Sequence, residues 1–376
     1  MRVLITGGGT GGHVTPALAI AENIKQNEKE FEIAFVGTKN GIENRLVGAE
    51  GYKIYHVKVK GIRRSLSPAN IVALFYAVKS PHDAKKIIKE FKPDVVIGTG
   101  GYVCWPILKA ASKMHIPTMV HESNAIPGLA VKMLQNHVNC ILTNFEQTKD
   151  LLEQKHKVVC VGNPTKSAFL GYNTESARKA ANIPDNIKKV IVSCGGSLGA
   201  ERVNEAMLEV MRSVAERPDV MHIHATGKCG YDEFMEKAKH AGITECNNIR
   251  IFDFIDNMPI YISAADLVVS RAGAITVSEL ALAKKPAVLI PSPNVVDNHQ
   301  FKNAKLLADA KAAVMLEERN IIEGTAEKLV LDMLEDDILL KTLSSNIAQF
   351  AREDANRLIL HEIRSCIETY KKLVRK

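Results

Sequence analysis

The sequence lacks the features that mark several common classes of protein. No apolar run approaches the ~18 residues of a membrane span, and Met1-Arg2 leads directly into a short strand pattern rather than a signal-peptide core. The seven cysteines are scattered without C-x-x-C spacing, so we expect reduced thiols of a cytoplasmic protein rather than disulfides or a zinc site. No Asp-x-Asp and no P-loop signature occurs. We therefore expect no required metal and no cofactor.

Aromatic residues make up only 5% of the chain, and none interleaves with basic residues as a base-stacking platform requires. A nucleic-acid-binding protein is therefore the weaker alternative, and we expect no nucleic-acid partner. The net charge of +7 is unevenly spread, because residues 1–163 hold 21 Lys and Arg against 13 Asp and Glu, whereas residues 164–345 hold 21 against 25. This imbalance indicates that the N-terminal part meets an anionic partner.

The 376 residues are too many for one ordinary core, so we expect two domains. Short Val- and Ile-rich runs alternate with segments of helical spacing, which is typical of a parallel sheet covered on both faces. The expected strands are 3–6, 32–37, 95–98, 118–122, 140–144 and 158–162, and then 190–194, 221–226, 249–254, 267–270 and 287–291. The pattern occurs twice, and it predicts an α/β protein of two doubly wound, Rossmann-like domains. We place them at 1–163 and 164–345, followed by a helical tail over 346–376.

Each expected domain opens with a strand that runs into glycines and then into a helix. The first reads "VLITGGGTGGHVTPALAIA" and the second "VIVSCGGSLGAERVN". Glycine lets a ligand approach the backbone closely, and the following helix offers free N–H groups to a phosphate. The first loop formally matches the dinucleotide fingerprint, but the second strand ends in Gly37-Thr38 where that reading needs an acidic residue. The sequence therefore favours a phosphate ligand other than NAD.

The stretch "SRAGAITVSE" (270–279) narrows the class of ligand. Gly273 precedes an expected helix, and Glu279 falls in its first turns. Such a helix start can take a pyrophosphate, and a carboxylate one turn further on can bind two vicinal hydroxyls. Gln300, in "DNHQFKNA" (297–304), adds hydrogen-bonding capacity. Together these features fit a nucleotide sugar.

At this point the chain resembles a known family, the MurG N-acetylglucosaminyltransferases of bacterial peptidoglycan synthesis. The ordered motifs that carry the resemblance span about residues 1–304: "GGGTGGHVTPALAIA", "GGYV" (100–103), "HESNAIPG" (121–128), "VGNP" (161–164), "GGSLGA" (195–200), "FIDNM" (254–258), "SRAGAITVSE" and "DNHQFKNA". The resemblance implies a GT-B fold, with an N-terminal domain for the acceptor and the membrane, a C-terminal domain for UDP-GlcNAc, and a last helix that crosses back to the first domain. It implies transfer of GlcNAc, with inversion, to the MurNAc 4-hydroxyl of lipid I, which gives lipid II and UDP.

The resemblance also assigns roles to residues. His13 matches the proposed general base, and the positive end of the following helix favours the neutral imidazole that such a base needs. The donor-binding positions are Thr10, Gly11, Gly12, Asn124, Lys166, Ser197, Ile255, Ala274, Ile275, Thr276, Glu279 and Gln300. The acceptor-binding positions are Tyr102, His121 and Asn124. Lys166 departs from the Arg that is frequent in the family and loses its bidentate fork. Trp105 stands where small residues are common, and we expect it to pack in the core or at an interface.

A lipid acceptor accounts for the basic N-terminal part. Ile71, Leu74 and Phe75 fall on one helical stripe, and nine Lys and Arg lie in residues 58–92 against two acidic residues. An apolar stripe rimmed by cations suits an anionic bilayer, although the same spacing is typical of a core-facing stripe. We expect membrane contact through Ile71, Leu74, Phe75, Arg63, Arg64, Lys85 and Lys86, at the cytoplasmic face of the cell membrane. Cell-wall assembly proteins are further candidate partners, and a sugar-nucleotide epimerase on the same fold is the competing enzyme reading.

Overall fold

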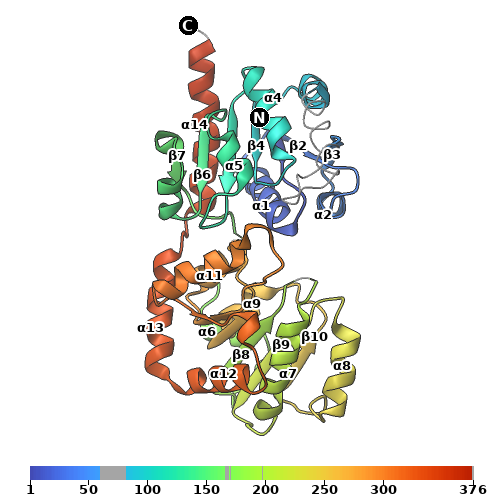
Figure 1. The fold of residues 1–376 in the computed structure, drawn as a ribbon, viewed down its shortest axis with the longest axis vertical. Coiled ribbons are helices and arrows are strands. Elements are labelled where there is room, and N and C mark those ends of the chain that lie inside the picture. Colours follow the sequence, from blue (N-terminus) through green and yellow to red (C-terminus); the bar gives the residue numbers. More distant parts are fainter. Residues whose placement is uncertain (60–81, 166–168, 170, 197, 375–376) are drawn as a thin grey trace. The chain divides into compact units, whose positions relative to one another are not determined.

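The computed structural model describes residues 1–59, 82–165, 169, 171–196 and 198–374. The chain forms two compact units (Figure 1). The N-terminal unit comprises Met1–Thr165 together with Asp354–Lys376, and the C-terminal unit comprises Lys166–Glu353. The first boundary therefore follows Thr165, close to the Gly-Asn-Pro stretch of the sequence.

The N-terminal unit is built on a seven-stranded parallel sheet of order β3-β2-β1-β4-β5-β6-β7. The strands are β1 (Arg2–Thr6), β2 (Glu32–Gly37), β3 (Lys53–His56), β4 (Val95–Gly98), β5 (Thr118–Glu122), β6 (Cys140–Thr143) and β7 (Val158–Cys160). Successive side chains alternate between the two faces, so Val3 and Ile5 join one buried cluster and Leu4 joins the other. Both faces are covered, which explains the continuous apolar runs of the inner strands.

Helices from distant parts of the chain cover these two faces. On one side α1 (Gly11–Asn27) packs beside α14 (Ala355–Val374). On the other lie α4 (Cys104–Lys113), α5 (Leu129–Leu134) and a helix within 82–91. The unit also contains α2 (Glu43–Ala49) and the short 3₁₀ segments η1 (Glu146–Leu151) and η2 (Lys155–Lys157). Trp105 packs as expected. Its side chain lies against the buried cluster beneath α4 and α5, and its ring centroid is 5.5 Å from that of His137.

The C-terminal unit has a six-stranded parallel sheet of order β10-β9-β8-β11-β12-β13. Its strands are β8 (Lys189–Cys194), β9 (Val220–Ala225), β10 (Ile249–Phe252), β11 (Leu267–Ser270), β12 (Ala287–Leu289) and β13 (Val314–Met315). Its helices are α6 (Thr174–Ala180), α7 (Glu201–Ala215), α8 (Tyr231–His240), α9 (Met258–Ala264), α10 (Ala274–Ala283), α11 (His299–Asp309), α12 (Thr325–Glu335) and α13 (Asp337–Ile347). Its short 3₁₀ segments include η4 (Val296–Asn298), η5 (Glu318–Asn320) and η6 (Ala348–Phe350). Two doubly wound parallel sheets confirm the predicted fold class.

The C-terminal tail differs from the single helical segment expected over 346–376. Helix α13 continues to Ile347, and α14 begins only at Ala355. Asp354 stands just before α14, where an acidic residue favours a helix start, and its carboxylate pairs with Arg357. Helix α14 belongs to the N-terminal unit, where Arg364 contacts Glu28 at 2.7 Å.

Candidate active site

The strand order of each sheet fixes where a ligand can bind. In the N-terminal unit the order reverses between β1 and β4, and in the C-terminal unit it reverses between β8 and β11. In open α/β sheets, ligands bind outside the carboxyl ends of the strands at such a switch point. The two glycine-rich loops of the sequence, 7–12 and 195–199, follow β1 and β8. Each unit thus carries its loop at its own switch point.

The first glycine loop is packed against a second pair of glycines after β4. A Cβ atom built on Gly101 would lie 2.2 Å from the Gly8 carbonyl oxygen, and one built on Gly100 would lie 2.5 Å from Cδ2 of His13. Both residues also have positive φ, 83° at Gly101 and 107° at Gly100. Only glycine fits these positions without displacing the loop or the imidazole. The "GG" of "GGYV" therefore holds His13 in place.

His13 lies in the first turn of α1, and its tautomer follows from its partners. Its Nδ1 is 3.2 Å from the Gly8 carbonyl oxygen and 3.1 Å from Oγ1 of Thr10. A carbonyl oxygen only accepts, so Nδ1 carries the proton in the neutral ring and Nε2 carries the lone pair. The Thr10 hydroxyl is thus a second hydrogen-bonding partner of Nδ1. The arrangement provides a proton-accepting nitrogen at the switch point.

Glu43 is a buried acid that the sequence motifs did not reveal. It is 1% exposed, although it begins the short helix α2. Its carboxylate accepts hydrogen bonds from the Thr38 N–H at 2.7 Å, the Thr38 hydroxyl at 2.9 Å and the Gly9 N–H at 3.3 Å. It therefore ties the first glycine loop to the end of β2.

Tyr102 and Asn124 lie in loops that follow β4 and β5. Tyr102 is 37% exposed, and its ring is 2.9 Å from a Cβ built on Gly9, so it packs against the first glycine loop. Asn124 is held by the buried carboxylate of Glu122, a second acid that the motif assignment passed over. Burial raises the pKa of Glu122, while hydrogen bonds from Gly128 and Asn124 oppose that rise.

His121 occupies a different place from the expected acceptor contact. Its side chain is fully buried, its Nε2–H donates to the Gly162 carbonyl oxygen at 2.9 Å, and its Nδ1 lies 3.3 Å from the Ser123 hydroxyl. Burial lowers its pKa to about 4. Since both ring nitrogens are engaged inside the unit, the expected direct contact with the acceptor is corrected. His121 instead ties β5 to the end of the N-terminal unit.

In the C-terminal unit the second glycine loop interlocks with the loop after β9. A Cβ built on Gly199 would lie 2.2 Å from the Thr226 carbonyl oxygen, and one built on Gly227 would lie 2.0 Å from the Gly199 nitrogen. Helix α7 begins directly after this loop, and its N-cap residue, Ala200, provides no side-chain cap. Ser197 and Lys166, two expected donor contacts, lie outside the described residues.

Helix α10 starts at the other side of this switch point. Its N-cap is Gly273, which has no side chain to bond the first N–H groups of the helix. Ala274, Ile275 and Thr276 form the first turn and are half-buried. Glu279 is near Cys194 at the end of β8, since its charge adds to the burial that raises the pKa of the Cys194 thiol to about 11. The half-buried carboxylate of Glu279 thus lies near the strand end that leads into the second glycine loop.

Two other expected donor residues follow β10 and β12 in the chain. The side chain of Ile255, after β10, is buried at 5% exposure, so only its backbone can meet a ligand. Gln300, in the first turn of α11, accepts the Ser292 N–H at 2.9 Å through Oε1. That bond fixes the amide orientation and makes Nε2 the end that can donate to a sugar hydroxyl.

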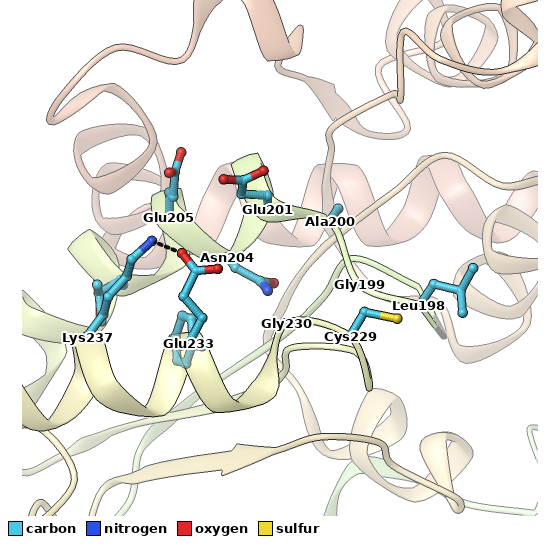
Figure 2. Close-up of a pocket in the computed structure, with 12 residues that line it drawn as sticks. Leu198, Gly199, Ala200, Glu201, Asn204, Glu205, Cys229, Gly230, Glu233 and Lys237 are labelled. Atoms are coloured by element: carbon cyan, nitrogen blue, oxygen red, sulfur yellow. Dashed lines mark hydrogen bonds and ion pairs between the residues drawn. The ribbon is translucent and has the colours of Figure 1, made fainter.

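A pocket beside the second glycine loop does not coincide with these residues. Figure 2 shows Glu201 and Glu205 of α7, with Glu233 and Lys237 of α8, around this pocket. Lys237 is paired with Glu233 at 2.6 Å. Glu205 is paired with Arg202 at 3.0 Å, and the carboxylate of Glu201 disfavours a diphosphate. None of the expected site residues that the structure describes lines it, so this pocket gives no support to the expected donor contacts.

The described residues contain neither a candidate metal site nor a helix that could span a membrane. Within residues 1–59, 82–165, 169, 171–196 and 198–374, no group of three His, Cys, Asp or Glu side chains could hold a metal ion. In the same part of the chain, no helix is both long and apolar enough to cross a membrane.

The chain is similar in sequence to known glycosyltransferases. Two family models match the chain, the glycosyltransferase family 28 N-terminal domain over residues 3–143 and the glycosyltransferase family 28 C-terminal domain over residues 190–359. A UDP-N-acetylglucosamine–N-acetylmuramyl-(pentapeptide) pyrophosphoryl-undecaprenol N-acetylglucosamine transferase from Acetivibrio thermocellus is 41% identical over 368 residues, which cover 98% of this chain and 99% of that protein. A protein of the same name from Thermoanaerobacter sp. is 39% identical over 365 residues, which cover 97% of this chain and 100% of that protein.

Solved structures agree with these matches. The crystal structure of Acinetobacter baumannii MurG has a TM-score of 0.77 and 28% sequence identity, with coverage of 97% of this chain and 99% of that one. A putative UDP-N-acetylglucosamine 2-epimerase from Listeria monocytogenes has a TM-score of 0.67 at 15% identity, covering 98% and 97%. At that identity the second likeness shows the fold alone.

Proposed function

The chain belongs to the MurG family of glycosyltransferase family 28, and from that premise we propose that it transfers GlcNAc from UDP-GlcNAc to the MurNAc 4-hydroxyl of lipid I. The products are lipid II and UDP. The structural observation that carries the proposal is the orientation of His13, whose Nδ1 is bonded to the Gly8 carbonyl oxygen so that Nε2 is the basic nitrogen.

The proposed mechanism is a single displacement with inversion at the anomeric carbon. Nε2 of His13 takes the proton of the attacking hydroxyl as the new glycosidic bond forms. The bond between the anomeric carbon and the diphosphate oxygen breaks, and its electron pair leaves with UDP. General-base assistance matters because a neutral hydroxyl is a weak nucleophile.

The donor's diphosphate is assigned to the second switch point. The backbone N–H groups of Ala274, Ile275 and Thr276, together with the second glycine loop, would supply fixed dipoles for the charge that develops on UDP. Glu279 is assigned to the ribose hydroxyls and the backbone of Ile255 to the uracil. Nε2 of Gln300 is assigned to the GlcNAc hydroxyls. Thr10, Gly11, Gly12, Asn124, Lys166 and Ser197 complete the proposed donor contacts.

The acceptor is assigned to the N-terminal unit. Tyr102 and Asn124 are the proposed contacts, because both lie in loops at the carboxyl end of the first sheet. The acceptor's lipid would keep the enzyme at the cytoplasmic face of the membrane. Lys85 and Lys86 are exposed on a helix whose Ile87 and Ile88 enter the core, so they are available to an anionic surface. Arg63, Arg64, Ile71, Leu74 and Phe75 lie outside the described residues.

The test is transfer of labelled GlcNAc from UDP-GlcNAc to a water-soluble lipid I analogue. We expect a labelled disaccharide product and stoichiometric UDP. The competing function, a UDP-sugar epimerase, would convert the donor without the muramyl lipid. Release of UDP that depends on the acceptor supports the transferase, and donor conversion in its absence supports the epimerase.

A further inference from the structure

One peptide group joins Glu43 to His13. The Gly9 N–H donates to Oε2 of Glu43 at 3.3 Å, and the Gly8 carbonyl oxygen accepts from Nδ1 of His13 at 3.2 Å. This N–H and this C=O belong to the same peptide bond, the one between Gly8 and Gly9. A carboxylate, a peptide and an imidazole therefore form one continuous hydrogen-bonded chain.

The carboxylate is fixed at its other end by Thr38. Oε1 of Glu43 takes both the N–H and the hydroxyl of Thr38, at 2.7 and 2.9 Å. Glycines make the space for it, because a Cβ on Gly8, Gly37 or Gly41 would come within 2.9, 2.4 and 2.1 Å of its side-chain atoms. The loop sequence is thus shaped around a buried acid.

We propose that Glu43 is a positioning residue for the general base and acts on His13 through the Gly8–Gly9 peptide. A carboxylate that accepts the N–H polarises the peptide and makes its C=O a stronger acceptor. The stronger acceptor holds the proton on Nδ1 and directs the lone pair of Nε2 toward the substrate. Glu43 would thus orient His13 as the acid of a catalytic triad orients its histidine, except that a peptide group lies between the carboxylate and the imidazole.

The hydrogen bond between the Gly9 N–H and Glu43 also affects whether the first glycine loop can bind a phosphate group. The Gly9 N–H is already engaged, and a second anion beside the Glu43 carboxylate would meet like charge. The Gly9 N–H is therefore committed to the anchor of the base, and the donor's diphosphate is assigned to the helix start of α10. This inference rests on the proposed function of His13.

The test is Glu43→Gln. Glutamine keeps the shape but has one acceptor oxygen, so its NH₂ must face either the Gly9 N–H or the Thr38 donors. We expect kcat to fall about tenfold or more, which is a smaller loss than the roughly 10²–10⁴-fold expected when the base itself is removed. KM for UDP-GlcNAc should stay unchanged. Glu50→Gln is the matched control, because Glu50 is exposed at the end of the same helix. Thr38→Val, which removes one bond to the carboxylate, should give a smaller loss in the same direction.

A second readout does not depend on activity. In protein labelled with ¹⁵N-histidine, the His13 signals are identified among the 12 histidines by their loss in His13→Ala. We expect a protonated Nδ1 in the wild type and a mixture of tautomers in Glu43→Gln. The other titratable side chains at this loop, Tyr102 and Cys104, are unchanged in both proteins.

Unchanged kcat and an unchanged tautomer in a folded Glu43→Gln protein would overturn the proposal. If Glu43→Gln does not fold, the same two measurements on Thr38→Val decide. A wild-type protein that transfers no GlcNAc would contradict the proposed function instead, and the tautomer measurement would still test the link between Glu43 and His13.

Discussion

Glu122 holds Asn124 by two hydrogen bonds, from the backbone N–H at 3.0 Å and from the side-chain amide at 3.1 Å. Its second oxygen accepts the Gly128 N–H at 2.7 Å, just before α5. One buried carboxylate therefore shapes the whole turn that carries the proposed acceptor contact. Its position resembles that of Glu43 under the first glycine loop.

Replacing Glu122 by Gln should disturb this turn, because an amide NH₂ would face an N–H donor. A buried donor left without an acceptor costs about 1–3 kcal/mol. We expect the N-terminal unit to lose stability by that order and KM for the acceptor to rise, with UDP affinity unchanged. Denaturation followed by fluorescence of Trp105, the single tryptophan, reports this unit. Wild-type stability and KM in the variant would contradict the assignment.

Glu279→Gln should weaken binding of both UDP and UDP-GlcNAc. Loss of a charge-assisted hydrogen bond costs about 1.5–3 kcal/mol, or roughly 10- to 100-fold in affinity. Isothermal calorimetry measures it. Glu205→Gln is the control, since Glu205 lines the neighbouring pocket rather than the α10 start. Equal effects of both variants would move the donor site to that pocket.

His13→Ala should lower kcat by ~10²–10⁴-fold, the usual contribution of a general base. UDP affinity should stay near wild type, because the nucleotide is assigned to the other unit. Single-turnover transfer with saturating donor measures the chemical step. Near-normal turnover would make His13 structural and would place the base elsewhere.

The fold was largely predictable because each inner strand is buried on both faces. Val95–Gly98 and Leu267–Ser270 read as continuous apolar runs and are strands in the structure. The edge strands β3 and β13 were missed. The first, "KIYH", is half-exposed with no continuous apolar run, and the second has only two residues. Edge strands carry little of the apolar signal that marks the centre of a sheet.

The candidate site was only partly predictable. Glycine loops and a carboxylate near a helix start are local signals, so His13 and Glu279 could be proposed from the sequence. Glu43 and Glu122 act on backbone groups of other loops, and nothing in their own neighbourhood reveals this. The closest signal for Glu43 was "GTKNGIE", where two glycines precede an acid. His121 shows the opposite error, because a motif position does not say whether a side chain faces a ligand or the core.

Two buried histidines predict an acid-sensitive C-terminal unit. Ser193 lies 2.7 Å from both Nε2 of His222 and Nδ1 of His224, and Nε2 of His224 lies 3.2 Å from Oδ1 of Asn204. Because Nδ2 of Asn204 donates to Thr226, its Oδ1 must accept from His224. Ser193 then donates to His224 and accepts from His222, so both rings are neutral. Burial lowers the pKa of His224 to about 3 and that of His222 well below its usual value.

Since both folded-state pKa values are depressed, the unfolded chain binds more protons below pH ~6.5. Stability from these histidines is present above that pH and is lost as the pH falls toward the folded-state values. His224→Gln should remove one titrating group and flatten the pH dependence between 6 and 4 by up to ~1.4 kcal/mol per pH unit. Denaturant unfolding followed by circular dichroism measures it, with exposed His156 changed to Gln as control. Equal slopes for the two variants would show that His224 does not titrate as described.

The membrane prediction uses the basic residues of the N-terminal unit. Changing Arg63, Arg64, Lys85 and Lys86 together to Gln should weaken binding to vesicles that contain anionic phospholipid, by ~1 kcal/mol per cation that lies near the surface. Wild-type binding should also fall as salt rises. Transfer to a water-soluble acceptor should be retained, because the sugar-binding residues are untouched. Vesicle sedimentation and the soluble-acceptor assay measure the two effects.

The control for charge alone removes four exposed lysines of the C-terminal unit, Lys188, Lys239, Lys328 and Lys341. This variant loses the same number of charges, so a general electrostatic attraction would weaken its binding equally. A surface confined to the N-terminal unit predicts near wild-type binding instead. Leu74→Ser with Phe75→Ser then tests the apolar contribution. If that double variant lowers the thermal transition while its folded fraction still binds vesicles, the stripe packs in the core and the membrane contact lies elsewhere.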